Sequence, residues 1–274
     1  MKIKVTLVKL WAVLACCLTL GVILFLFGYI FVDGAGAISW EFLTQSPKGM
    51  VIGTEGGILP AIVGSAWYTG IACLFGGVLG ICTAIYQVYY CPSEKVAGAI
   101  ALVMKCMAGV PSIVMGLFGY TLLVRSLGWG KCILAGGITQ GVMILPFIQV
   151  RAEKALREVD PGLVKASYGL GMSKAYTIRR IVLPQCLPQL VSGLILGACY
   201  AMGAAAPLIF TGAVIIAKVP QSVMKPAMAL PYHLYMLLTQ GTSSENAYGT
   251  AFVMMMIVLV TNTLATWFTW RKQK

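Results

Sequence analysis

The stretch RAEKALREVDPGLVKASYGLGMSKAYTIRRIVLPQC, residues 151–186, decides how the rest of the chain is interpreted. It is polar and basic, and it lies between two uncharged apolar stretches, residues 132–150 and 187–216. Both flanking stretches are long enough to cross about 30 Å of hydrocarbon as helices. Long loops inside a compact membrane domain are usually functional. We therefore expect a helical membrane domain whose function depends on this connection.

Further apolar stretches extend to both ends of the chain. The composition is 59% hydrophobic and only 10% charged, with a mean hydropathy of +0.88, whereas soluble domains average about 45–50% apolar and about 25% charged residues. Helices satisfy their own backbone polar groups in lipid. We therefore predict an all-α polytopic membrane protein, a single transmembrane domain over residues 1–274 with about six spans. The predicted spans are residues 10–32, 60–86, 97–124, 132–150, 187–216 and 248–270.

The distribution of lysine and arginine predicts the orientation of the spans. Cytoplasmic segments carry an excess of these residues, and the excess is large if both termini and residues 151–186 are cytoplasmic. Lys105 then lies near a membrane boundary. The net charge of +12 is therefore mostly a topological signal, and we expect no nucleic-acid partner. The inner cations would be Lys2, Lys4, Lys9, Lys95, Arg151, Lys154, Arg157, Lys165, Lys174, Arg179, Arg180, Arg271, Lys272 and Lys274, and the outer ones Lys48, Arg125, Lys131, Lys218 and Lys225.

The polar connection contains a spaced motif. KASYGLG at residues 165–171 is followed, after nine residues, by IVLP at residues 181–184. This resembles the cytoplasmic coupling motif of ABC importer permeases: Glu-Ala-Ala, three residues, Gly, nine residues, Ile, one residue, Leu-Pro. The spacing is matched throughout, although Lys165 replaces Glu and Ser167 replaces the second Ala.

The resemblance implies a type I importer fold in which this segment contacts a separate ATPase. The implied coupling residues are Lys165, Ala166, Ser167, Gly171, Met172, Leu183 and Pro184. Small side chains at Ala166 and Ser167 would let a short helix approach the partner closely. Gly171 would allow a sharp turn between two helices, and Leu183-Pro184 would end the second helix before the chain re-enters the membrane.

Three other stretches narrow the resemblance to the phosphate permeases of the PstA and PstC type. They are GGILPAIVGS at residues 56–65, AGVPSIVMGLFG at 108–119 and AMALP at 227–231. A break at Gly109, Pro111 and Ser112 inside an apolar span frees backbone groups, which a membrane tolerates only where they face protein, water or substrate. We interpret this break as lining a translocation pathway, with a simple packing kink as the alternative.

One family motif is changed in this chain. The phosphate permeases usually carry Arg-Ala-x-Gly-Glu-Thr-Ala-Pro-Leu, whereas residues 200–208 read YAMGAAAPL, so Tyr200 and Ala204 replace the Arg and the Glu while Pro207 is kept. The explanations are that a partner permease carries the charges for both halves, that the solute is not phosphate, or that the copy is degenerate. An oxyanion would be held by hydroxyls such as Ser112 and Tyr200, and by Lys105 unless that lysine reaches the cytoplasmic interface.

The sequence predicts transport without chemistry on the solute. It has no phosphate-binding loop, no His-Glu-x-x-His motif and no nucleophile with a histidine partner, so we expect no enzyme activity and no cofactor. Its nine cysteines form no Cys-x-x-Cys pair and resemble small hydrophobic residues. The single histidine, His233, is expected in an outer interfacial loop.

Taken with the resemblance, these features predict the permease subunit of an ABC importer, for phosphate or for another oxyanion such as molybdate, tungstate or sulfate, or for an unrelated solute. The implied partners are an ATPase subunit in two copies, a second permease that is a paralogue of this one, an extracytoplasmic solute-binding protein and membrane lipid. The expected location is the inner membrane of a bacterium or archaeon, crossed several times.

Overall fold

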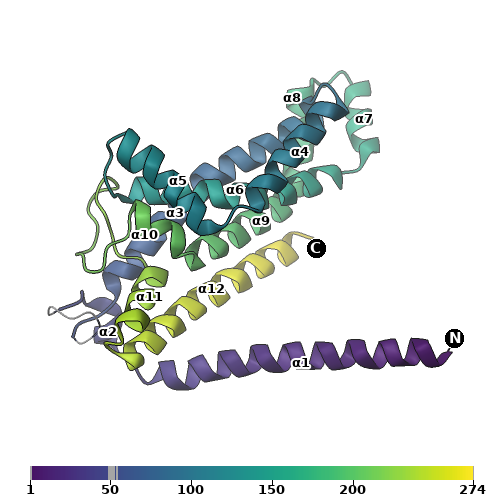
Figure 1. Cartoon of the computed structure of the whole chain (residues 1–274). Coiled ribbons are helices and arrows are strands. Elements are labelled where there is room, and N and C mark those ends of the chain that lie inside the picture. The colour runs from purple at the N-terminus through teal and green to yellow at the C-terminus, as the bar shows by residue number, and fades with distance from the viewer. Residues whose placement is uncertain (1, 49–52, 54, 274) are drawn as a thin grey trace.

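The computed structural model describes residues 2–48, 53 and 55–273, with no side-chain description for residues 2–7 and 268–273. Within this part of the chain the protein is helical, with isolated bridges but no extended strand. The long helices run side by side and the short ones gather at both ends (Figure 1). The helices are α1 (Lys2–Ala35), α2 (Trp40–Thr44), α3 (Leu59–Ile85), α4 (Glu94–Ala108), α5 (Ser112–Gly119), α6 (Ile133–Arg157), α7 (Pro161–Gly169), α8 (Lys174–Thr177), α9 (Leu183–Gly203), α10 (Ala206–Thr211), α11 (Leu230–Gln240) and α12 (Ser244–Gln273), with π-helical turns η1 (Tyr86–Tyr90), η2 (Tyr120–Ser126) and η3 (Ile178–Val182).

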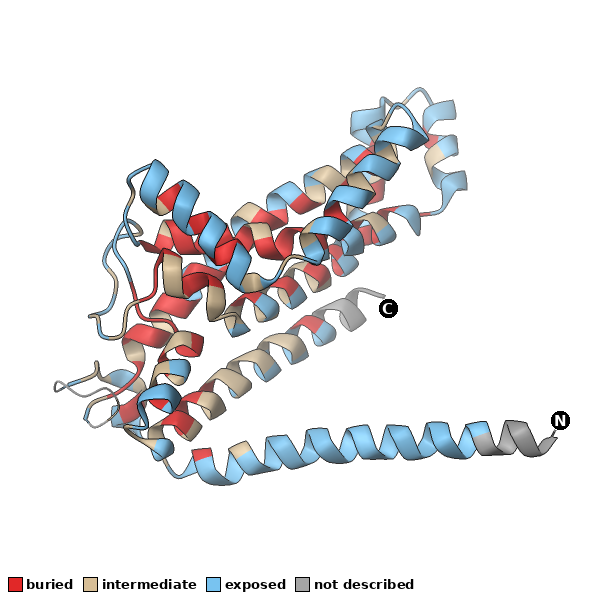
Figure 2. Ribbon diagram, viewed as in Figure 1, coloured by how far each residue is buried: buried red, intermediate tan, exposed pale blue. Residues whose placement is uncertain are grey.

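Helix α6 forms the centre of the bundle and packs along α3. Its apolar residues are buried along most of its length, as Figure 2 shows. The two backbones touch where glycines face each other, because a Cβ atom at Gly76 would collide with the carbonyl oxygen of Gly141. Such small residues allow close helix packing in lipid, where van der Waals contact replaces the hydrophobic effect between helices. Helix α9 covers another side of α6.

The prediction of an all-α bundle with about six spans is confirmed. Five helices are long and apolar enough to cross a membrane: Val8–Ala35, Leu59–Tyr90, Ile133–Arg157, Lys174–Gly203 and Ser244–Trp267. The sixth candidate is a pair of shorter helices, Glu94–Ala108 and Ser112–Ser126, bent by 98° where they meet.

Two predicted spans differ from the structure. Residues 97–124 do not form one crossing helix, because Pro111 removes a backbone donor and Gly109 ends α4. The predicted span over residues 187–216 is also wrong at both ends. Its helix begins upstream, at Lys174, and stops at Gly203, where Ala204 adopts an extended conformation before the short helix α10.

The end of the bundle that carries α2 and α11 is closed by loops and short helices. Helix α11 lies at this end, and the Ser65 hydroxyl of α3 accepts a hydrogen bond from the Leu230 backbone N–H at 2.8 Å. His233, expected in a loop, instead lies on α11 with only 3% of its surface exposed. An amphipathic helix covers the bundle here, and the histidine is on its inner face.

Helix α1 stands apart from the other helices over most of its length (Figures 1 and 2). Its described side chains are almost all exposed, and it meets α12 near its C-terminal end. There the hydroxyls of Tyr29 and Tyr248 lie 3.1 Å apart and the rings of Phe31 and Phe252 are 5.5 Å apart. The far ends of α1 and α12 both extend toward the end of the bundle that carries α7 and α8 (Figure 1).

Candidate functional site

The polar connection of residues 151–186 folds into a helical hairpin beyond one end of the bundle. Helix α7 begins at Pro161, and the preceding Asp160 caps it, its Oδ1 accepting from the Gly162 N–H at 2.8 Å. The chain then reverses at Gly171, whose φ of +79° is in the region that favours glycine. Ser173 caps α8, accepting from the Tyr176 N–H. Local sequence signals thus define both helices and the turn between them.

The two short helices are joined by buried hydroxyls. Ser167 Oγ of α7 and Thr177 Oγ1 of α8 lie 3.2 Å apart, and both residues are buried. The expectation that Ser167 presents a small surface to a partner is therefore wrong, because its side chain is used inside the hairpin. Lys165 and Ala166 are exposed, and Leu170 is 77% exposed although it is apolar. These residues form part of the free surface of the hairpin, together with exposed neighbours such as Tyr168 and Tyr176.

Leu183 and Pro184 do not end a helix as expected. The helix that starts at Lys174 continues through the π-turn η3 into α9, with Pro184 in the first turn of α9, where proline is tolerated. Leu183 is half-buried, Pro184 is exposed, and Met172 is half-buried beside the turn. The hairpin is therefore connected directly to a span rather than through a flexible link.

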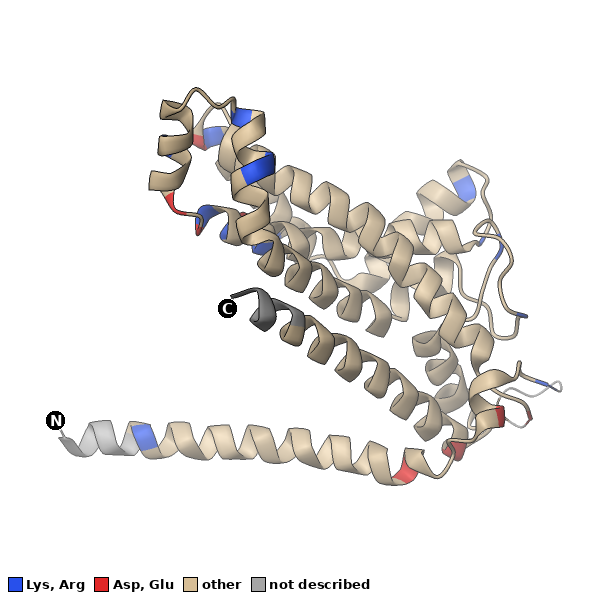
Figure 3. Ribbon diagram, turned by 180° about the vertical axis from the view of Figure 1, so that it is seen from behind, with Lys and Arg blue, Asp and Glu red and all other residues tan. Residues whose placement is uncertain are grey.

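Charged residues are unevenly distributed between the two ends of the bundle (Figure 3). Lysines and arginines gather on α7, α8, η3, the end of α6 and the start of α4. The opposite end carries both signs, with acids on and around α2 and with Lys48, Arg125, Lys131, Lys218 and Lys225. At the basic end, the Arg157 Nε donates to Glu153 Oε1 at 2.9 Å. Lys2, Lys4, Arg271, Lys272 and Lys274, which contributed to the orientation prediction, lie outside the described side chains.

The first helix break separates α4 from α5. Gly109 caps α4, its N–H donating to the carbonyls of Lys105 and Cys106, and Pro111 precedes the first residue of α5, Ser112. Gly109 and Pro111 are exposed, and Ser112 is half-buried. No side chain in the described part of the protein is hydrogen-bonded to this break, so backbone bonds alone define it.

The second break separates α9 from α10 and is held by a buried side chain. The Gln140 Nε2 of α6 donates to the carbonyl oxygens of Ala201, at 2.9 Å, and Ala204, at 3.2 Å. These are carbonyls at the end of α9, where regular helical partners run out. Gln140 is 1% exposed, and its own Oε1 is without a hydrogen-bond partner. The amide therefore fixes the position of the break against α6.

The two breaks meet through the helices that follow them. A Cβ atom at Gly116 of α5 would lie 2.8 Å from Pro207 Cα of α10, so the two backbones are in direct contact. Pro207 is buried. Tyr200, by contrast, is half-exposed on α9, with its ring 4.9 Å from that of Phe147. The structure thus brings the two broken helices together, but no hydrogen bond joins Ser112 to Tyr200.

Lys105 is the charged residue next to the breaks. It lies in the last turn of α4, four residues before Gly109, and its side chain is exposed without an ion pair among the described residues. Counted from Glu94, it lies about 16 Å along the helix, at about 1.5 Å per residue. The start of α4 is at the basic end of the bundle (Figure 1), so Lys105 lies farther from that end than Lys95 does.

Sequence reasoning overlooked three buried glutamines, Gln87, Gln140 and Gln149. Gln140 and Gln149 lie inside a predicted span and Gln87 directly follows one, and uncompensated polar groups in lipid are costly. Because of this cost, a glutamine in or beside an apolar span could have been recognised from the sequence as a residue with a buried hydrogen-bond partner. It also overlooked the contact made by Gly116.

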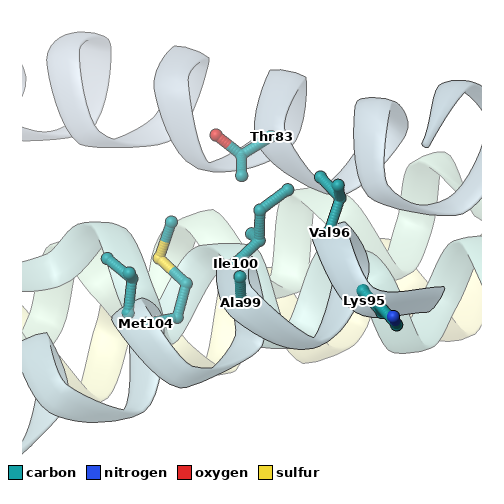
Figure 4. Close-up of a pocket in the computed structure, with 7 residues that line it drawn as sticks. Thr83, Lys95, Val96, Ala99, Ile100 and Met104 are labelled. Atoms are coloured by element: carbon teal, nitrogen blue, oxygen red, sulfur yellow. The ribbon is translucent and has the colours of Figure 1, made fainter. Parts of the chain in front are cut away.

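Two hollows flank these elements. A groove of about 450 Å³ runs between α3 and α4, and Thr83, Val96, Ala99, Ile100, Met104 and Lys95 line it together with Val103 (Figure 4). A polar hollow of about 410 Å³ lies at the other end of the bundle, where Glu41, Lys48 and Glu55 approach Asn246. In the described part of the chain, no group of three or more His, Cys, Asp or Glu side chains could share a metal ion.

Comparison with known proteins gives one family and several relatives. Residues 76–271 match the family described as the binding-protein-dependent transport system inner membrane component. The chain is 30% identical over 257 residues to the probable ABC transporter permease protein YqgI of Bacillus subtilis, covering 88% of this chain and 87% of that protein. It is 31% identical to the phosphate transport system permease protein PstA 2 of Mycobacterium bovis, over 73% of this chain and 66% of that one.

Solved structures share the fold at low identity. A structure of the MetNI methionine ABC transporter aligns with a TM-score of 0.65 at 17% identity, covering 78% of this chain and 95% of that one. A bacterial alginate ABC transporter, in complex with an alginate pentasaccharide-bound periplasmic protein, aligns with a TM-score of 0.66 at 16% identity, over 96% of both chains.

Proposed function

The chain belongs to the family of inner-membrane components of binding-protein-dependent transport systems, the permeases of ABC importers, and from this premise we propose that it carries inorganic phosphate inward as one half of the importer's membrane pore. The family consists of membrane permeases rather than enzymes. ATP is hydrolysed by a separate subunit, which drives the bundle between outward-open and inward-open states.

The single observation that carries the coupling role is the hairpin of α7 and α8. It projects from the basic end of the bundle, it exposes Lys165, Ala166 and Leu170, and it is continuous with the α9 span. A rigid connection of this kind can transmit a movement of the hairpin to the break at the end of α9. We place this end, and with it both termini, in the cytoplasm, in accordance with the positive-inside rule.

The proposed partners follow from the family. They are two copies of an ATPase subunit at the hairpin, a second permease that is a paralogue of this chain, and an extracytoplasmic binding protein. The alginate transporter was crystallised with its periplasmic protein, which supports a partner of that kind here. The binding protein would dock at the opposite end of the bundle, around α2, α11 and the polar hollow lined by Glu41 and Asn246.

The pathway would run along the two helix breaks. Gly109, Pro111 and Ser112 would line one side, and Tyr200, Ala204 and Pro207 would shape the other. The similarity to phosphate permeases supports an oxyanion solute. Because Tyr200 and Ala204 are uncharged, we assign the cation on this half of the pathway to Lys105 and expect the paralogous permease to supply the Arg and Glu of the family motif.

Radiolabelled phosphate uptake in a strain that depends on this transporter tests the solute. Uptake should disappear when the gene is deleted and when the partner ATPase carries a defective nucleotide-binding loop. Unchanged uptake after deletion would defeat the phosphate assignment.

A second candidate is a permease for another oxyanion, such as molybdate, tungstate or sulfate, or for an unrelated solute, and the uncharged residues at positions 200 and 204 favour it. Competition of each unlabelled anion against phosphate uptake separates these candidates. If a rival anion is itself carried and phosphate does not compete with it, the importer assignment stands with a different solute.

A further inference from the structure

A chain of hydrogen bonds runs from the hairpin end of α6 to helix α4. The Arg157 Nε donates to Glu153 Oε1 at 2.9 Å, and the Gln149 Nε2 donates to Glu153 Oε2 at 3.1 Å and to Gln87 Oε1 at 2.6 Å. The Gln87 Nε2 donates in turn to the backbone carbonyl of Ala97, at 3.2 Å, on α4. Three residues after Arg157 comes Asp160, which caps α7. The network therefore links α4 to the end of α6 that leads directly into the hairpin.

The donors and acceptors of the network determine which way the Gln149 amide is oriented. Gln149 has acceptors on both sides, a carboxylate and an amide oxygen, so both of its N–H groups are used and its orientation is determined. It is fully buried, with 0% of its surface exposed, and Gln87 is 5% exposed. Buried hydrogen bonds to a charged group are stronger than those between neutral groups. The two amides therefore act as a firm connection inside an otherwise apolar region.

Gln87 lies within the π-helical turn η1, which continues α3. A π-turn changes the phase of a helix and is frequent at functional sites. Here, Gln87 is the buried residue of the turn. It is the residue that spans the space between α6 and α4.

Helix α4 has few other attachments. Met104 is its buried residue, most of its surface is exposed (Figure 2), and the groove of about 450 Å³ separates it from part of α3 (Figure 4). The apolar contacts of Met104 would allow α4 to slide along its neighbours, because such contacts are not directional. The hydrogen bond from Gln87 to the Ala97 carbonyl is directional and fixes the position of α4 along its axis. The amide chain is the polar attachment of α4 to the centre of the bundle.

We propose that Gln149 and Gln87 form a positioning relay that transmits the movement of the ATPase-coupled hairpin to α4 and so to the break at Gly109. The relay rests on the proposed function, since it assumes that the hairpin is moved by an ATPase. Neither glutamine contacts the solute. They determine whether α4 follows α6 when the nucleotide-binding subunits close.

A distance measurement tests the relay without any knowledge of the solute. The permease is assembled with its ATPase and partner permease in lipid nanodiscs, and spin labels are attached to keto amino acids introduced at Ala99 of α4 and at the exposed Leu264 of α12, a helix that carries no residue of the relay. Keto labels avoid the nine native cysteines. The interlabel distance is measured by pulsed EPR in the nucleotide-free state and after trapping with ATP and vanadate.

The relay predicts that trapping shifts the distance in the wild-type protein and in the control Thr139→Val, since the buried Thr139 hydroxyl bonds only within its own helix, to the Ala135 carbonyl. Gln149→Met, which keeps the volume but removes the amide, should abolish the shift while vanadate trapping persists. Gln87→Met should do the same, and the double variant should be no worse than either single variant, because residues of one network are not additive. Uptake of phosphate per ATP hydrolysed should fall about tenfold in each variant.

Several results would overturn the relay. They are a wild-type distance that does not respond to trapping, a full shift in Gln149→Met or Gln87→Met, or a loss of shift in Thr139→Val as well. If Gln149→Met does not fold, Gln149→Glu replaces it, since its carboxylate would face that of Glu153 and should also abolish the shift. Failure of the complex to bind any ATPase would instead refute the proposed function, and failure of phosphate uptake alone would refute only the solute.

Discussion

The two helix breaks of this protein are built differently. The break between α9 and α10 is anchored by Gln140, which binds two carbonyls from a position that is 1% exposed, and it is followed by the buried Pro207. The break between α4 and α5 is exposed, carries no side-chain anchor among the described residues and leads from a helix that is bounded by a groove. We call the first the held break, because a buried side chain anchors it, and the second the free break, because no described side chain does.

This difference suggests a division of labour within the membrane domain. A pathway that opens and closes needs a fixed wall and a moving one, and packed cores do not deform continuously. The close backbone contact between Gly116 and Pro207 would then be the pivot about which α5 rotates relative to α10. The relay through Gln149 would move the other half, α4.

The largest effect is expected where the two breaks touch. Gly116→Leu places a side chain against the Pro207 and Ala206 backbones, which cannot move aside, so folding should be destabilised by about 3 kcal/mol or more. The amount of folded protein in detergent, measured by size-exclusion chromatography, should drop sharply. Gly109→Ala is the matched control, since its Cβ would meet its nearest neighbour, the Cys106 carbonyl, at an ordinary 3.5 Å. Equal yields of the two variants would contradict the contact.

The cation at the free break should affect transport rather than folding. Lys105→Gln removes a charge-assisted contact to an anionic solute, worth about 1.5–3 kcal/mol, so phosphate uptake should fall about tenfold or more. Assembly with the ATPase should be unchanged. Lys95→Gln, at the start of the same helix, should leave uptake within about twofold. Normal uptake by Lys105→Gln would remove the cation from this half of the pathway.

The anchor of the held break should contribute to stability. Gln140→Leu leaves the Ala204 carbonyl without its buried donor, and the expected loss is about 1–3 kcal/mol in the free energy of unfolding. Thermal unfolding of the purified protein measures it. Thr69→Val is the control, because the buried Thr69 hydroxyl has no hydrogen-bond partner, and its loss should be neutral or stabilising. Indistinguishable melting of Gln140→Leu and wild type would show that the second break is as free as the first.

Acid should loosen the packing of α11, which covers the end of the bundle opposite the hairpin. Burial lowers the pKa of His233 to about 4 from its ordinary value near 6.5, so the folded state binds the proton less well than the unfolded state. Stability is therefore complete above about pH 6.5 and is lost as the pH falls toward 4, by about 1 kcal/mol at pH 5.5. His233→Gln should unfold with less dependence on pH in this range. An identical pH dependence in both proteins would contradict the burial of His233.

Much of the fold could be predicted from local sequence. Apolar length predicted most of the spans, the spacing of residues 165–184 predicted the class of transporter, and the Gly109-Val110-Pro111 sequence predicted a break. The size of the bend could not be predicted, because it depends on which surface α5 finds after Pro111, and that surface is α10. The end of α9 at Gly203 was missed because Ala204, Ala205 and Ala206 are good helix formers.

The site was predicted less well, for a physical reason. Ser167 has the size that an exposed contact needs, but a hydroxyl is also suited to a buried bond, and only the fold shows that Thr177 is opposite. Leu183-Pro184 looked like a stop, yet proline in the first turn of a helix is compatible with continuation. The three glutamines acquire their roles from helix pairing, which a single sequence does not specify.

The central claim is that the hairpin of α7 and α8 is moved by a separate ATPase. A photo-crosslinking amino acid at Leu170, which is 77% exposed on the hairpin, tests it directly in the intact complex within membranes. The account predicts a crosslink to the nucleotide-hydrolysing subunit from Leu170, and none from Trp40 at the opposite end. A crosslink to the solute-binding protein from Leu170, or an ATPase crosslink from Trp40 instead, would contradict it.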